Sequence, residues 1–177
     1  MTRYIAAAFI TLSCVISGTA QTTSADGLTA VRPLVGRWQG TSEGQPGKAS
    51  VEREYTELFG SRFIHVRNRS TYAPQEKNPK GEIHEDVGVF SFDSARRRVV
   101  LRQFHTEGFV NQYVLDPDAK PDRPVFTTEA IENIAAGWRA RETYVLLGRD
   151  EFEEIFELAA PGKEFEVYSH ARFKRAQ

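Results

Sequence analysis

Short connections between alternating runs are the feature that most limits how this chain can fold. Runs with the two-residue period of a β-strand follow one another from residue 34 to residue 174. Most links between them are short and rich in Gly, Asp, Asn or Pro, such as Phe59-Gly60-Ser61 and Glu107-Gly108. Short links join antiparallel neighbours, because a parallel pair needs a crossover of about a dozen residues or more. The runs cover residues 34–41, 49–57, 62–72, 83–92, 98–105, 109–115, 125–128, 139–147, 151–158 and 165–174.

Ten such strands in one small domain would leave two unpaired edges, and closing the sheet on itself removes both. We therefore predict an all-β fold, a single antiparallel up-and-down β-barrel of about ten strands. A barrel of eight strands holds one small ligand, so ten leave a cavity unless large side chains fill it. A sandwich is the alternative, but no segment resembles the long return connection of a Greek key. Residues 129–136 are the best helical candidate and fit a strand extension equally well.

The first strand carries a large ring between two glycines. Gly36 and Gly40 flank Trp38, although glycine weakens a strand and has no side chain to pack. This arrangement predicts a bend or a close backbone approach around the indole, as where a barrel closes over its own end. An edge strand with a surface tryptophan is the alternative reading.

The N-terminus has the pattern of a secretory signal. Arg3 precedes an uncharged run over residues 4–15, and small residues lead to a cleavage site after Ala20. The run is shorter than the roughly 20 residues that span a bilayer, so a retained anchor is less favoured. We predict a signal peptide over residues 1–20, a flexible lead-in over 21–33, a barrel domain over 34–177, and a periplasmic or secreted location.

Composition narrows the function classes. The 23 Lys and Arg nearly balance the 24 Asp and Glu, so no charge excess favours nucleic acid or an anionic membrane surface. The single cysteine, Cys14, would leave with the signal, and the mature chain would have no disulfide. Metal, phosphate-loop and nucleophile motifs are absent from the sequence, so no residue pattern requires an enzyme.

The third strand is polar on both faces. Strand alternation gives one face to Phe63, His65, Arg67, Arg69 and Thr71, and the other to Ile64, Val66, Asn68, Ser70 and Tyr72. Such a strand fits a barrel whose lumen is partly polar, and it fits an exposed hairpin nearly as well. If the first reading holds, Arg67 or Arg69 would pair with an acidic group of a ligand.

The last strands show a clearer alternation. An apolar face of the final strand is formed by Phe165, Val167, Ser169, Ala171 and Phe173. Tyr168, His170 and Arg172 lie on the other face, which simple alternation turns toward solvent. In the preceding strand, we interpret Glu151, Glu153, Glu154 and Glu157 as a solvated outer face over Phe152, Phe156 and Leu158.

Two motifs resemble a known family. Gly36-x-Trp38-x-Gly40-x-Ser42-x-Gly44 is similar to the Gly-x-Trp-x-Gly-x-Gly-x-Gly signature of the nitrobindins, haem-binding barrels of the calycin superfamily, with Ser42 replacing one glycine. His84-x-Asp86-x-Gly88 resembles their His-x-Glu-x-Gly strand. The second half is more similar to uncharacterised secreted lipocalin-like proteins of bacteria.

The resemblance implies roles for residues of the final strand. In lipocalins a basic residue from that strand covers the Trp of the first strand, a role open to Arg172 or Arg175 over Trp38. Nitrobindins bind haem iron through a histidine of the final strand. Aligning the chain ends puts this ligand at Tyr168, with His170 two residues later, and either side chain type can bind haem iron.

Three functional hypotheses follow. The first is a barrel that binds a small, mainly apolar or amphipathic molecule in its lumen. Its candidate ligand-binding residues are Trp38, Arg67, Arg69, His84, Tyr168 and Arg172. The second is a haem protein acting on nitric oxide or peroxynitrite, with His170 or Tyr168 on the iron. The third is a filled barrel that binds a protein partner through residues 73–80 and 116–124.

Overall fold

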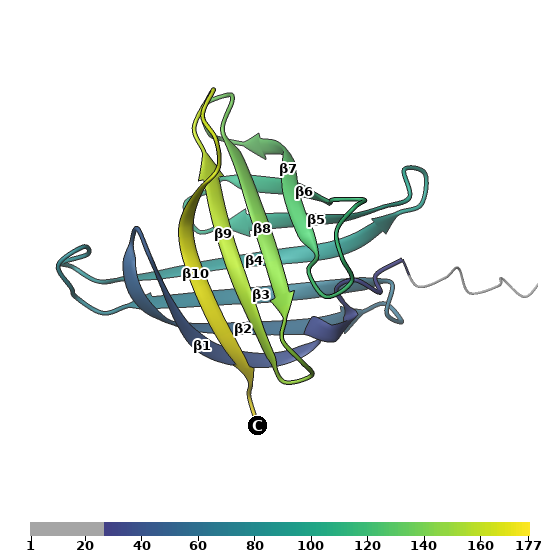
Figure 1. Ribbon diagram of the computed structural model, residues 1–177, viewed down its shortest axis with the longest axis horizontal. Coiled ribbons are helices and arrows are strands. Elements are labelled where there is room, and N and C mark those ends of the chain that lie inside the picture. Colours follow the sequence, from purple (N-terminus) through teal and green to yellow (C-terminus); the bar gives the residue numbers. More distant parts are fainter. Residues whose placement is uncertain (1–26) are drawn as a thin grey trace, which may run out of the picture.

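The computed structural model describes residues 27–177, and this part of the chain forms a closed antiparallel barrel of ten strands (Figure 1). Each strand pairs with its neighbours in chain order, and the first strand pairs with the last. The predicted up-and-down barrel is confirmed, and the sandwich is wrong. The strands are β1 Gly36–Gly44, β2 Gly47–Leu58, β3 Phe63–Tyr72, β4 Glu82–Asp93, β5 Arg98–His105, β6 Val110–Leu115, β7 Val125–Glu132, β8 Arg139–Leu146, β9 Glu151–Ala159 and β10 Glu166–Arg175.

The barrel closes where β1 runs beside β10, and a glycine makes this approach possible. Gly40 pairs with Phe173, and a Cβ atom on Gly40 would lie 1.9 Å from the carbonyl oxygen of Arg172. No side chain fits in that space. The predicted close approach of the backbone is therefore confirmed at the seam of the barrel, and the edge-strand reading of β1 is wrong.

Trp38 plugs one end of the barrel. Its indole is buried, its Nε1 donates a hydrogen bond of 2.7 Å to the carbonyl of Leu34, and its ring meets Phe152 edge to face at 4.8 Å. The guanidinium of Arg175 lies 4.1 Å from the indole centroid, close enough for a cation–π contact. Of the two arginines that the lipocalin resemblance offered for this role, Arg175 is the one that covers the ring.

A layer of aromatic and aliphatic side chains fills this end of the interior. The largest fully buried members are Tyr113, Phe90, Phe126, Phe152, Phe173, Leu28, Leu34, Ile64 and Leu101. Burying one such side chain stabilises a fold by about 1.5–3 kcal/mol. This layer is therefore a major source of stability, whereas the apolar side chains toward the other end, among them Ile131, Phe156 and Leu158, are only partly buried.

The folded domain begins earlier than expected. Leu28 and Val31 are buried in the aromatic layer, and the 3₁₀ turn η1, Arg32–Leu34, leads directly into β1. The predicted flexible lead-in up to residue 33 is thus wrong for residues 28–33, because their apolar side chains help to close the barrel end. The predicted signal peptide lies outside the described residues. Within those residues, no helix has the length and apolar character needed to cross a membrane.

The helical candidate at residues 129–136 continues a strand instead. β7 extends to Glu132, and its pairing with β6 shifts register between Gln112 and Tyr113. A turn containing Asn133, with φ of 62°, follows the strand. The strand-extension reading is confirmed as far as Glu132.

Candidate functional site

A cavity of about 420 Å³ occupies the interior beyond the aromatic layer. Its rim includes residues from the ends of hairpins, among them Pro46 between β1 and β2, Phe109 between β5 and β6, and Ile134 between β7 and β8. A cavity of this size suits one small molecule. The interior is therefore only partly filled, which removes the premise of the filled-barrel hypothesis.

A buried ion pair forms the floor of the cavity. Arg53 of β2 donates to both carboxylate oxygens of Glu154 of β9, at 2.9 and 3.3 Å, and its guanidinium lies 5.0 Å from the ring centroid of Phe173. The Arg53 side chain is 8% exposed. Burial disfavours its charge, but Glu154 outweighs that effect and holds the pKa of Arg53 above its usual range. The pair separates the aromatic layer from the cavity.

A second acid, Glu142 of β8, lies beside this pair. It is buried and accepts a hydrogen bond of 2.5 Å from the hydroxyl of Tyr144. Burial, together with the negative charges of Glu154 and Asp86, raises the pKa of Glu142 to about 8. Glu142 is therefore protonated at neutral pH and adds a neutral hydrogen-bonding group to the cavity wall.

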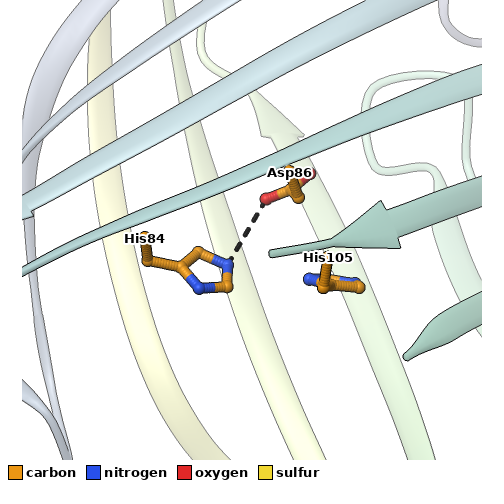
Figure 2. Close-up of side chains that lie close together, drawn as sticks. All are labelled: His84, Asp86 and His105. Carbon is orange, nitrogen blue, oxygen red and sulfur yellow. Dashed lines mark ion pairs between the residues drawn. The ribbon is translucent and has the colours of Figure 1, made fainter. Parts of the chain in front are cut away.

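Two histidines and an aspartate meet on the cavity wall (Figure 2). His84 and Asp86 point inward from β4, two residues apart, and His105 comes from the end of β5 beside Asp86 in the strand register. His84 Nε2 lies 3.6 Å from Asp86 Oδ2, and His84 Nδ1 lies 2.7 Å from Glu107 Oε1. One nitrogen or carboxylate oxygen from each member of this triad, His84–Asp86–His105, lies within 4.8 Å of the others.

The charges of the triad follow from its contacts. Asp86 and Glu107 raise the pKa of His84 to about 8, against the opposing effect of burial. Burial disfavours the charge of Asp86, but contact with His84 and the charge of Arg53 keep its pKa below the usual range. Burial lowers the pKa of His105. At neutral pH the triad therefore contains an imidazolium, a carboxylate and a neutral imidazole.

Amide side chains surround the triad. Asp86 Oδ1 accepts hydrogen bonds from Asn68 Nδ2 at 2.6 Å and from Gln103 Nε2 at 2.8 Å. The Asn111 amide lies 3.2 Å from His105 Nε2. Among the described residues, four buried atoms on these cavity-lining side chains have no hydrogen-bond partner. They are Asn68 Oδ1, Gln103 Oε1, His105 Nδ1 and Asn111 Oδ1. An unpaired buried polar atom costs about 1–3 kcal/mol, so this cluster is costly for stability alone.

Two predicted binding arginines lie on the outer face instead. Arg67 and Arg69 flank Glu85 of β4, with nitrogen to oxygen distances of 3.2 and 3.7 Å. The Arg67 side chain is 60% exposed. Asn68 and Ser70, on the opposite face of β3, line the cavity. The expectation that Arg67 or Arg69 faces the lumen is therefore wrong, because Asn68 and Ser70 occupy the inward face of β3 and alternation turns both arginines outward, where they pair with Glu85.

The final strand separates residues that alternation placed together. Its pairing with β9 shifts register between Val167 and Ser169, and this β-bulge turns Tyr168 toward the cavity. His170 points outward, with its Nε2 3.3 Å from Glu153 and its side chain 46% exposed. Arg172 points outward too, 2.8 Å from Glu151. The solvent-facing prediction is correct for His170 and Arg172 and wrong for Tyr168, and Arg172 is no lining residue.

These positions do not fit haem held through the final strand. His170 is on the outside of the barrel, so it cannot reach a ligand in the lumen. Tyr168 lines the cavity, but burial and the charge of Glu82 raise its pKa, which disfavours loss of its phenolic proton. A tyrosine that ligates haem iron gives up that proton.

Of the other predicted ligand-binding residues, His84 and Tyr168 line the cavity, whereas Trp38 lies in the plug below it. Sequence reasoning missed Arg53, Glu154 and His105 as cavity residues. A signal for Glu154 was present, because it shares strand parity with the inward Phe152 and Phe156. Asp86 was part of a motif but had no assigned role.

No family model matches the sequence, and no curated protein matches it. Among solved structures the fold is similar to Rv2717c from M. tuberculosis, with a TM-score of 0.67 and 21% identity over 86% of this chain and 99% of that chain. It is also similar to the S-type phycobiliprotein lyase CPES from Guillardia theta, with a TM-score of 0.53 and 12% identity over 87% of this chain and 98% of that chain. At these identities the likeness shows the fold alone, a closed antiparallel β-barrel.

Proposed function

We propose that this barrel binds one amphipathic small molecule, in the periplasm or outside the cell. The observation that carries the proposal is the cavity of about 420 Å³, whose wall has an apolar part and a hydrogen-bonding part. The apolar part consists of Ile131, Ile134, Trp138, Phe156, Leu158 and Tyr168. Contacts of this type favour the apolar body of a ligand.

The polar part points to the chemistry of the ligand's head group. The side chains of Asn68 and Gln103 each have a carbonyl oxygen without a hydrogen-bond partner. The nearby arginine, Arg53, is already engaged by Glu154. A head group that donates hydrogen bonds, such as a hydroxyl or an amine, suits these acceptors better than a carboxylate does. The expected ligand is thus amphipathic rather than mainly apolar.

Fluorescence titration with 1-aminoanthracene, an aromatic amine, tests this function. We expect saturable binding that decanol and decylamine reverse, with decanoate a weaker competitor. Trp138→Ala removes a large apolar contact from the cavity wall and is expected to weaken binding about 10-fold or more. Leu147→Ala is the matched control, because Leu147 is an exposed apolar residue that does not line the cavity. Absence of saturable binding, or equal affinities in wild type and Trp138→Ala, would overturn the proposal.

Haem binding is the weaker candidate for this cavity, and the inward position of Tyr168 is what favours it. Titration of the purified protein with haemin, followed at the Soret band, separates the two functions. A saturable shift that Tyr168→Phe abolishes and His170→Ala leaves intact would support haem. We expect no such shift, because the surroundings of Tyr168 disfavour loss of its proton.

A further inference from the structure

We propose that the triad His84–Asp86–His105 is a binding site for a divalent transition metal, with zinc as the best match. Two imidazoles and one carboxylate form a common set of protein ligands for such ions. All three side chains line the cavity, so a metal bound there would face the ligand space. Metal binding does not depend on the amphiphile-binding function proposed above.

The distances are close to those that a metal needs. Ligand atoms around tetrahedral zinc lie about 3.3 Å apart, given bonds of about 2.0–2.1 Å. His84 Nε2 and Asp86 Oδ2 are 3.6 Å apart, and the whole group of ligand atoms lies within 4.8 Å. Bringing the three atoms into range requires shortening the longest of these separations by at most about 1.5 Å. Figure 2 shows the side chains converging from β4 and β5.

A second layer of contacts orients each ligand. Glu107, 2.7 Å from His84 Nδ1, accepts the proton on that nitrogen, so a metal that displaces the proton of His84 Nε2 would find its lone pair directed toward Asp86. Metal-binding histidines almost always make this kind of contact with a carboxylate or carbonyl oxygen. Asn68 and Gln103 both donate to Asp86 Oδ1, so that Oδ2 remains available.

The third ligand has the same support. The side-chain amide of Asn111 lies 3.2 Å from His105 Nε2, and a flip of this amide by about 180° turns its carbonyl oxygen toward that nitrogen. With its carbonyl oxygen on that side, Asn111 accepts the proton of His105 Nε2. His105 Nδ1 then presents a lone pair, and this buried atom has no partner among the described residues. A metal ion accounts for that orphaned nitrogen.

Three protein ligands leave a coordination position open to the cavity. This is the arrangement of zinc sites that bind water or a substrate, whereas structural sites are closed by four protein ligands. The acidic group of Glu82, His84 and Glu107 shares one histidine with the triad but lies nearer the surface. The triad is the better site, because it supplies two imidazoles in a less exposed setting.

The test uses untagged, purified protein that has been treated with a chelator and dialysed. Zn²⁺ is titrated by calorimetry at pH 7.5, and Co²⁺ is titrated by visible absorption, which reports coordination number. We expect saturable uptake of one equivalent of metal. His105→Gln should weaken binding by about 100-fold or more, and Glu107→Gln by about 10–100-fold. His170→Ala is the control, because it removes a histidine beside Glu153 on the outer face.

Two outcomes would overturn the metal site. The first is the absence of saturable uptake, in which case the triad is an ion pair with a neighbouring histidine. The second is uptake that His105→Gln leaves unchanged while circular dichroism shows the variant to be folded. Because these titrations contain no organic ligand, failure of the metal site is distinguishable from failure of the amphiphile-binding function.

Discussion

The buried carboxyl of Glu142 makes the stability of the barrel depend on pH in a way that can be calculated. Its pKa is raised from the ordinary 4.5 to about 8 by burial and by nearby acids. A raised folded-state pKa means that the bound proton stabilises the native state. That stability is complete below about pH 4.5 and is lost as the pH rises through about 8.

One pKa unit corresponds to about 1.4 kcal/mol, so raising the pKa from 4.5 to about 8 limits the effect to about 5 kcal/mol. Between pH 5.5 and pH 8 the same linkage predicts a loss of about 3 kcal/mol of folding free energy from Glu142 alone. The charged groups that act on it are Glu154, Asp86 and Arg53, and Tyr144 donates to it.

Urea unfolding, followed by circular dichroism at several pH values in the presence of a chelator, measures this loss. Glu142→Gln keeps an acceptor for Tyr144 but cannot ionise. The difference in unfolding free energy between wild type and Glu142→Gln should therefore change by about 3 kcal/mol between pH 5.5 and pH 8. Titrating groups that do not interact with Glu142 are common to both proteins and cancel. Glu54→Gln, on the exposed face of β2, is the control and should follow wild type. Parallel curves for wild type and Glu142→Gln would refute the reasoning.

Two further predictions concern the ion pair on the cavity floor and the pairing of β1 with β10 that closes the barrel. Arg53→Met should destabilise the barrel by about 3–5 kcal/mol because it leaves Glu154 buried and unpaired, whereas Arg53→Met combined with Glu154→Met should recover most of that loss in urea unfolding. Equal losses in the single and double variants would contradict this. Gly40→Ala should cost about 3 kcal/mol or more, because its Cβ meets the carbonyl of Arg172, while Gly148→Ala, with nothing within 4 Å, should be nearly neutral in thermal unfolding. A tolerated Gly40→Ala would show that the seam is looser than its geometry indicates.

The strand count and closure were predictable because they depend on local signals. Alternation marks each strand, short turns make neighbours antiparallel, and a glycine such as Gly40 marks the close approach at the seam. The barrel start was predicted too late, because two short apolar side chains, Leu28 and Val31, carry no periodic signal of their own.

The site was less predictable because it depends on contacts between distant strands. The charges of Arg67 and Arg69 suggested that they bind a ligand, yet both side chains lie outside the barrel, where they pair with Glu85 of the neighbouring strand. Glu154 is inside because Arg53, 101 residues away in the chain, neutralises it there. The bulge that turns Tyr168 inward breaks alternation at one residue, and nothing in the composition of β10 marks that position.

The ion pair between Arg53 and Glu154 lies between the end of the barrel that is filled by core side chains and the end that contains the cavity. Below it, the aromatic layer around Trp38 and Phe152 holds the strands together. Above it, Ile134 and Trp138 line the cavity from the hairpin of β7 and β8 and are not part of the buried core. Substitutions at this upper end can therefore change which molecule is accepted at little cost to folding, which makes the barrel a suitable scaffold for selecting new binding specificities.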